Sequence, residues 1–297
     1  SGGKEGAGVQ IGLSTSTLFY KAECLLYKPK ANFSYYLMCG AASAFASLFN
    51  APIAGVFFGT QFAAPNTSRL DAYLSCISAS FCSVFISRAL NIHTLSFNTV
   101  TTLPISIGNF FLVIAFASII GLLSIAITSF MNYTKSKFNN LTKNPYLKVL
   151  YPSLILMVLN LVLLLTFKSS LYQGLGTQLF KNVMLNNGDY YSFFIKLILI
   201  VLTYAACFTG GEVVPLLLLG SLFGSAFALL FGLPQATFAT LGAVALLSGG
   251  TNLPLVCFSL GFELFKYQEP TLLFVTVAVA FVFSGLNGIY EHQKYPY

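Results

Sequence analysis

Two acidic residues that follow glycines are the strongest candidates for chemistry in this sequence. Lys4 and Glu5 stand side by side in SGGKEGAGVQIG at the start of the chain, and Glu212 follows two glycines in GGEVVPLLLLG. Each stretch reads as a glycine turn that opens a helix in an apolar segment. The first turn of a helix carries unpaired N–H groups and partial positive charge, so it attracts anions. Two such openings predict a paired anion site.

Three of the eight acidic residues fall within apolar motif segments: Glu5, Glu212 and Glu263. An ionisable group inside a membrane is costly, so each is a functional candidate. Glu5 is interpreted as a gate that carries a proton, with a structural acid at a helix N-terminus as the alternative. Glu212 and Glu263 are each either a structural carboxylate or a proton relay.

The composition places these residues in a membrane. Of the 297 residues, 56% are hydrophobic and only 8% are charged, whereas about 25% of the residues of a soluble domain are charged. The basic residues behind the net charge of +7 lie mostly in short connections between apolar segments. One such connection is the lysine-containing loop predicted at 133–148, which follows a span at 108–132. Positive charge in such loops sets membrane orientation. We therefore expect an integral membrane protein in a lipid bilayer, with no nucleic-acid partner.

Several apolar segments are too short to cross a bilayer, which needs about twenty apolar residues. The stretches 34–49, 53–64 and 236–250 are shorter, and Gly, Asn or Pro interrupts them. Broken or re-entrant helices are tolerated where their backbone is buried in protein or faces a water-filled cavity, which favours a channel or transporter. We predict an all-α polytopic membrane protein with broken and re-entrant helices.

An internal repeat supports this fold. Segment 40–62 aligns with 242–264, so that Asn50 meets Asn252 and the two glycine motifs also pair in order. Repeats with broken helices at matching positions place a transport site where the halves meet. Residues 1–107 are expected to be the remainder of the first repeat, without its N-terminal helices. Residues 108–297 are expected to form the second repeat and a C-terminal helix, in one transmembrane domain.

Other kinds of site find little support. The chain has two histidines, and its six cysteines form no C-x-x-C pair, so we expect buried free thiols and no metal site. The glycine motifs match neither a phosphate loop nor a dinucleotide fingerprint, so no cofactor is expected. Ser248 has no membrane-embedded histidine as a base, and we do not expect an enzyme.

Four stretches resemble the CLC family of chloride channels and transporters, in the right order along essentially the whole chain. GGKEGAGVQIG is similar to the family's G-[KR]-E-G motif, and FNAPIAGVFF to its next hallmark. GGEVVPLLLLG sits where the family has G-G-x-x-x-P, and GIYEHQ resembles its last short helix, which bears a tyrosine.

The resemblance implies a homodimer in a plasma membrane of bacterial type, with one pathway per subunit for halide anions. It assigns the external gate and proton carrier to Glu5 and a side-chain contact with the anion to Tyr290. The dimer interface would lie at about residues 51–90 and 251–284. The backbone amides that the resemblance assigns to anion binding are those of Gly3, Lys4, Glu5, Gly6, Glu212, Val213 and Val214.

The departures from the family pattern bear on the substrate. Gln61 and Phe62 stand where many chloride/proton exchangers carry two consecutive glutamates. GGEVVP is close to the G-G-E-V-T-P of the fluoride/proton branch, with Val214 in place of threonine. The predicted function is halide transport, of chloride or fluoride, coupled to protons. A passive chloride channel of the same fold and an unrelated ion-coupled solute carrier are the alternatives.

Overall fold

The chain folds almost entirely as helices, as expected, and the part that the structure describes contains twelve of them and no strand. The computed structural model describes residues 2–27, 32–62, 70–92, 97, 103–168, 170–206, 208, 210–285 and 287–290. The helices are α1 (Glu5–Leu26), α2 (Phe33–Phe49), α3 (Pro52–Gln61), α4 (Leu70–Ala89), α5 (Ile107–Leu141), α6 (Pro145–Phe167), α7 (Thr177–Met184), α8 (Ser192–Ala205), α9 (Val213–Phe231), α10 (Gln235–Thr251), α11 (Pro254–Glu263) and α12 (Pro270–Ser284).

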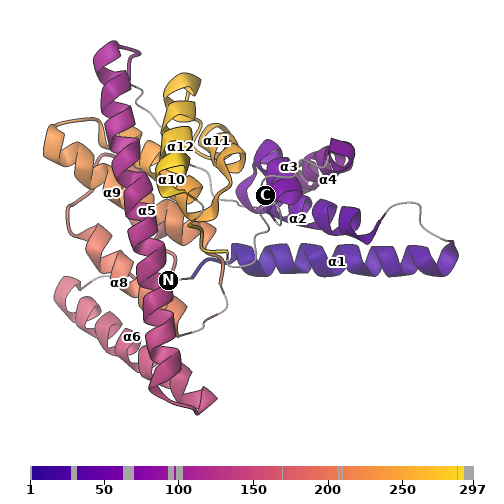
Figure 1. Cartoon of the computed structure of the whole chain (residues 1–297), viewed down its shortest axis with the longest axis horizontal. Coiled ribbons are helices and arrows are strands. Elements are labelled where there is room, and N and C mark those ends of the chain that lie inside the picture. The colour runs from indigo at the N-terminus through magenta and orange to yellow at the C-terminus, as the bar shows by residue number, and fades with distance from the viewer. Residues whose placement is uncertain are drawn as a thin grey trace.

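The helices differ in their ability to cross a membrane. Four in the described part are long and apolar enough to do so, namely α4, α5, α6 and α9. The apolar helices α2, α8, α11 and α12 have only 10–17 residues, which is too short for a hydrocarbon core about 30 Å thick. Figure 1 shows α1 to α4 gathered on one side, while α5 runs the full height of the other group. The short segments noted in the sequence are therefore short helices.

The prediction of a loop at 133–148 is wrong, because most of this stretch is helical. Helix α5 is 35 residues long and includes Lys135 and Lys137, while Lys148 lies in α6. Lysine is a good helix former, so polarity alone does not end the helix. The break comes at Asn144, whose side chain caps α6 by accepting a hydrogen bond from Tyr146 N at 3.0 Å.

The two aligned segments have the same backbone design. Helices α2 and α10 both have 17 residues and are followed by the C-cap residues Asn50 and Asn252, which have positive φ of 52° and 58°. Asparagine tolerates this left-handed conformation better than most residues. A proline then starts the ten-residue helices α3 and α11, because the first helical position needs no N–H. This local equivalence supports the repeat, whereas the division at residue 107 remains a prediction.

Matching glycines also make matching helix contacts. A Cβ on Gly12 of α1 would collide with the carbonyl oxygen of Gly40 on α2, and one on Gly220 of α9 would collide with that of Gly242 on α10. Only glycine allows two helix backbones to approach this closely. The pairs α1–α2 and α9–α10 are thus packed in the same way, each with one glycine-motif helix.

Glu263 joins the two aligned segments 40–62 and 242–264. Its Oε1 accepts a hydrogen bond from Ile53 N and its Oε2 one from Ala54 N, both at 2.9 Å. The carboxylate at the end of α11 therefore caps the start of α3, where the unpaired N–H groups of that helix lie. Both oxygens are engaged in this cap, which favours the structural interpretation of Glu263 over the relay.

Glu263→Ala should lower the free energy of unfolding by about 1–3 kcal/mol, because it removes a charged acceptor from two backbone donors at the start of α3, of which Ala54 N is partly buried. Denaturant unfolding in detergent measures this. Glu263→Gln keeps one acceptor and should lose less. Glu269→Ala is the matched control, since Glu269 stands at the N-cap of α12 without a side-chain cap bond. Equal effects at the two positions would contradict the cap.

Candidate functional site

The two glycine motifs meet directly. Gly3 N donates to Gly211 O at 2.9 Å, and Gly211 N donates to Gly3 O at 2.7 Å. Helix α1 begins two residues after Gly3, and α9 begins two residues after Gly211. The pair of backbone bonds therefore holds two helix N-termini side by side.

Glu5 fills the space between these openings. Its side chain is only 4% exposed, and its Oε1 accepts a hydrogen bond from Val214 N at 2.7 Å. The amides of Lys4 and Glu5 and the Lys4 ammonium lie close enough to act on the same carboxylate. Its Oε2 is buried with no hydrogen-bond partner among the described residues. A carboxylate from the start of α1 thus occupies the positive end of α9.

The glycines make room for this side chain. A Cβ on Gly3 would collide with the carboxylate oxygens of Glu5, and one on Gly211 would collide with Glu5 Cγ and Cδ. A Cβ on Gly6 would lie 3.2 Å from Gly211 N. The sequence-based site did not include Gly211, although the glycine pairing along the chain contained the signal for it.

Glu212 does not cap its own helix. It occupies the N-cap position of α9, but its side chain makes no capping hydrogen bond there. That position is taken by Glu5, which is more than two hundred residues away in the sequence. Glu212 is half-buried and lines a small cavity of about 30 Å³ together with Gly2, Gly210 and Gly211. Glu212 therefore makes no capping hydrogen bond to α9, and its role as a structural carboxylate or a proton relay stays a prediction.

The predicted backbone donors divide into three groups. Val214 N already binds an anionic group, the Glu5 carboxylate. Gly3 N is committed to the Gly211 carbonyl, so it is not directed at a ligand in this conformation. The remaining amides lie at helix starts, where N–H groups lack intrahelical partners: Lys4, Glu5, Gly6, Glu212 and Val213.

Tyr290 approaches the same region from the end of the chain. Its segment is held by a hydrogen bond from Ile289 N to Gly250 O at 2.8 Å. The Tyr290 ring packs edge-on against Phe62, with 4.9 Å between ring centroids, and the charges of Glu5 and Glu212 act on its phenol. Phe62 follows the last residue of α3, at the opposite end from the Glu263 cap. Tyr290 thus lies within electrostatic range of Glu5 and Glu212, whereas Glu263 is bonded at the other end of α3.

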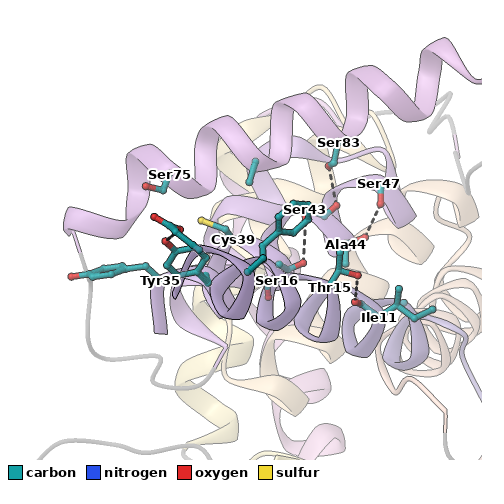
Figure 2. Close-up of a pocket in the computed structure, with 18 of the residues that line it drawn as sticks. Ile11, Thr15, Ser16, Tyr35, Cys39, Ser43, Ala44, Ser47, Ser75 and Ser83 are labelled. Carbon is teal, nitrogen blue, oxygen red and sulfur yellow. Dashed lines mark hydrogen bonds between the residues drawn. The ribbon is translucent and has the colours of Figure 1, made fainter. Parts of the chain in front are cut away.

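A large groove lies elsewhere, between α1, α2 and α4 (Figure 2), and has a volume of about 1000 Å³. Many hydroxyl groups line it, but several bond to backbone carbonyls. Thr15 donates to Ile11 O at 2.7 Å, and Ser83 donates to Ser43 O at 2.9 Å. Hydroxyls used in this way do not make an anion site, so the candidate site remains the one around Glu5.

Gly211→Ala should destabilise the fold by about 1–3 kcal/mol, the usual cost of overpacking, because its Cβ would overlap the Glu5 side chain. Gly108→Ala is the matched control, since a Cβ there meets nothing within 4 Å. The double variant Glu5→Ala/Gly211→Ala should recover much of the loss, which unfolding measurements arranged as a double-mutant cycle detect. Strictly additive costs would show that the Glu5 side chain is not the group in conflict.

Comparison with known proteins agrees with this geometry. The sequence model of the voltage gated chloride channel family matches residues 1–285. A chloride/fluoride channel protein of Pseudomonas syringae pv. tomato is 26% identical over 298 residues, which cover 98% of this chain and 64% of the relative. An uncharacterized protein of Methanocaldococcus jannaschii is 25% identical over 302 residues, which cover 99% of this chain and 73% of that protein.

Solved structures give the same result. A CLC-type fluoride/proton antiporter superposes with a TM-score of 0.90 at 28% identity, over 100% of this chain and 73% of that one. A slow cyanobacterial Cl⁻/H⁺ antiporter shares the fold, with a TM-score of 0.75 at 22% identity over 95% of this chain and 68% of that one. The chain spans 64% of the length of the Pseudomonas relative, and that bacterial match supports the expected plasma-membrane location. The resemblance noted in the sequence is confirmed: the chain is an integral membrane protein that belongs to the voltage gated chloride channel (CLC) family.

Proposed function

We propose that this protein moves halide anions across a membrane in exchange for protons, with Glu5 as the gate. The observation that carries the proposal is the hydrogen bond from Val214 N to Glu5 Oε1 at 2.7 Å. A carboxylate occupies a helix N-terminus, which is the kind of position that binds inorganic anions.

Gating then follows from competition for one positive position. The deprotonated Glu5 carboxylate holds the α9 opening and blocks a halide. Protonation removes its charge, weakens its attraction to the helix end and frees the amide for an anion. The proton would bind at the buried Oε2. Oε1 already accepts a hydrogen bond from Val214 N, whereas Oε2 has no hydrogen-bond partner among the described residues.

The halide would be held mainly by backbone N–H groups. A spherical ion needs several convergent donors and little else. Val214 N would serve the carboxylate and the halide in turn, and the amides of Lys4, Glu5, Gly6, Glu212 and Val213 would complete the set. Gly3 would act structurally through its bond with Gly211. The Tyr290 hydroxyl is the proposed side-chain donor, since the charges of Glu5 and Glu212 act on it.

Glu212 is the proposed second proton carrier. It is half-buried, lies next to Gly211 and acts on the same tyrosine as Glu5. Phe62 cannot carry a proton where many exchangers of the family have a glutamate. Glu263 is engaged in the α3 cap, so it is not part of the proposed path.

Both fluoride and chloride are proposed substrates. The antiporter that superposes with a TM-score of 0.90 is named for fluoride, and the Pseudomonas relative is named for both ions. Val214 departs from the threonine of the fluoride/proton branch, but its backbone amide makes the observed contact. The substitution therefore leaves that donor in place.

The protein is further proposed to be a homodimer. Large apolar side chains of α4 and α12, the helices of the predicted interface, face outward: Leu74 is 75%, Phe85 is 74% and Val282 is 72% exposed. Such faces suit either lipid or a partner subunit. The position of these faces in the 51–90 and 251–284 regions favours a partner.

Glu5→Gln should abolish proton movement and leave anion movement passive or stalled, because the amide cannot alternate between charged and neutral forms. Proteoliposome flux, with fluoride or chloride and protons recorded together, measures this. Glu23→Gln, on the same helix but bonded to Tyr36, is the matched control and should keep wild-type coupling. Glu212→Gln should slow proton movement by about a hundredfold or more, the usual size of a lost proton-transfer group.

Three results would contradict the proposal in different ways. Glu5→Gln protein that still exchanges protons at the wild-type ratio would remove Glu5 from the mechanism. A wild-type anion current that reverses at the anion equilibrium potential, independent of the pH gradient, would show the passive channel. Solute uptake that is insensitive to halides would show an unrelated carrier.

If the protein is a dimer, a bulky substitution on the outward face of α4 should weaken the assembly, whereas one on the outward face of α6 should not. Leu74→Trp on α4 should shift most of the protein from dimer to monomer in mild detergent, because the larger ring disturbs a packed interface. Leu165→Trp on α6, which is 68% exposed, should leave the mass unchanged. Light scattering coupled to gel filtration measures both. A wild-type protein that is monomeric at every concentration would rule out the proposed assembly.

A further inference from the structure

A small cavity borders the candidate site, and Glu5 is not among the residues that line it. Its volume of about 30 Å³ is enough for one water molecule or an ion of similar size. Gly211 and Glu212 form part of its wall, and Met131 of α5 and Tyr204 of α8 form another part. The cavity therefore connects the opening of α9 with the packed faces of α5 and α8.

Lys135 lies next to this wall. It follows Met131 by four residues on α5, so both side chains lie on one face of the helix, about one turn apart. The Lys135 ammonium lies 5.0 Å from the centroid of the Tyr204 ring, in a cation–π contact that holds the charge in place. The side chain is half-buried, and no carboxylate in the described part of the chain pairs with it.

A held, unpaired cation beside an anion site has a definite effect. It raises the local concentration of anions and the rate at which they arrive, and added salt weakens the effect. The effect on binding is greatest at low anion concentration, when the site is mostly empty. Lys135 acts one helical turn beyond the cavity wall and contributes no ligand to the ion itself.

We propose that Lys135 is the residue that draws anions toward the site, from the C-terminal end of α5. The proposal rests on the proposed halide transport and adds to it a direction of approach, from the C-terminal end of α5. Lys135 is a positioning residue for the incoming ion, and the Tyr204 ring fixes its ammonium.

Lys137 provides a matched control on the same helix. It lies two residues further, about 200° around the helix from Lys135. It is exposed and lines a separate surface depression with Tyr133 and Asn140. Reversing its charge changes the net charge of the protein by the same amount but leaves the face with Met131 unchanged.

The test is initial uptake of chloride and of fluoride into proteoliposomes. Lys135→Glu should lower uptake about 3- to 10-fold at concentrations well below half-saturation and change the maximal rate less than about twofold, as expected of lost electrostatic steering. Lys135→Arg should restore uptake, and Lys137→Glu should match the wild type within about 1.5-fold. The deficit of Lys135→Glu should shrink when potassium gluconate raises the ionic strength.

The outcomes separate the inference from the function it rests on. Transport by the wild type with equal losses in Lys135→Glu and Lys137→Glu would overturn the inference and leave the proposed function intact. A deficit of Lys135→Glu that appears only in the maximal rate and is independent of salt would also overturn it. A wild type that carries neither halide would overturn both. Gel filtration and thermal unfolding of each variant exclude misfolding as the cause of a loss.

Discussion

The site depends on the pair of backbone hydrogen bonds between Gly3 and Gly211. Each bond is about 3 Å long, and together they place the start of α1 against the start of α9. Two helix N-termini repel each other electrostatically when they are brought together, since each carries partial positive charge. The Glu5 carboxylate compensates for this by placing a negative charge between them. An anion in that position, fixed or mobile, therefore stabilises the arrangement.

The same requirement explains why the site combines glycine with an acid. The glycines remove the Cβ atoms that would otherwise occupy the volume of the carboxylate. Burying a carboxylate is costly unless hydrogen bonds and opposing charge compensate. Here one oxygen has a strong partner in Val214 N and the other has none among the described residues. The acid is therefore held well enough to stay in place but not so well that exchange is prevented.

Much of this could be predicted from sequence. Composition set the membrane environment, the glycine–acid pattern identified the two helix openings, and the alignment of 40–62 with 242–264 located the breaks at Asn50 and Asn252. These features are encoded locally, in turn residues and hydrophobic runs.

The errors concern partners that are distant in the chain. No local pattern shows that the Gly3 amide is used by Gly211, that Glu5 caps the helix that follows Glu212, or that Glu263 caps α3. Such contacts depend on how helices pack, which a single sequence does not specify.

The end of α5 was also predicted wrongly, for a local reason. Lys135 and Lys137 were expected in a loop because charge is common in connections, yet good helix formers extend α5 beyond its apolar part.

The length of α5 has a consequence for the bilayer itself. A helix of 35 residues is about 52 Å long, whereas the hydrocarbon core is about 30 Å thick. The excess is accommodated by tilt or by projection into the headgroup region, and lipid thickness sets the balance between the two. Met131 and Lys135 lie one turn apart on this helix, so a tilt of α5 against its neighbours would move both together. In that case acyl-chain length would act on the wall of the cavity beside the anion site.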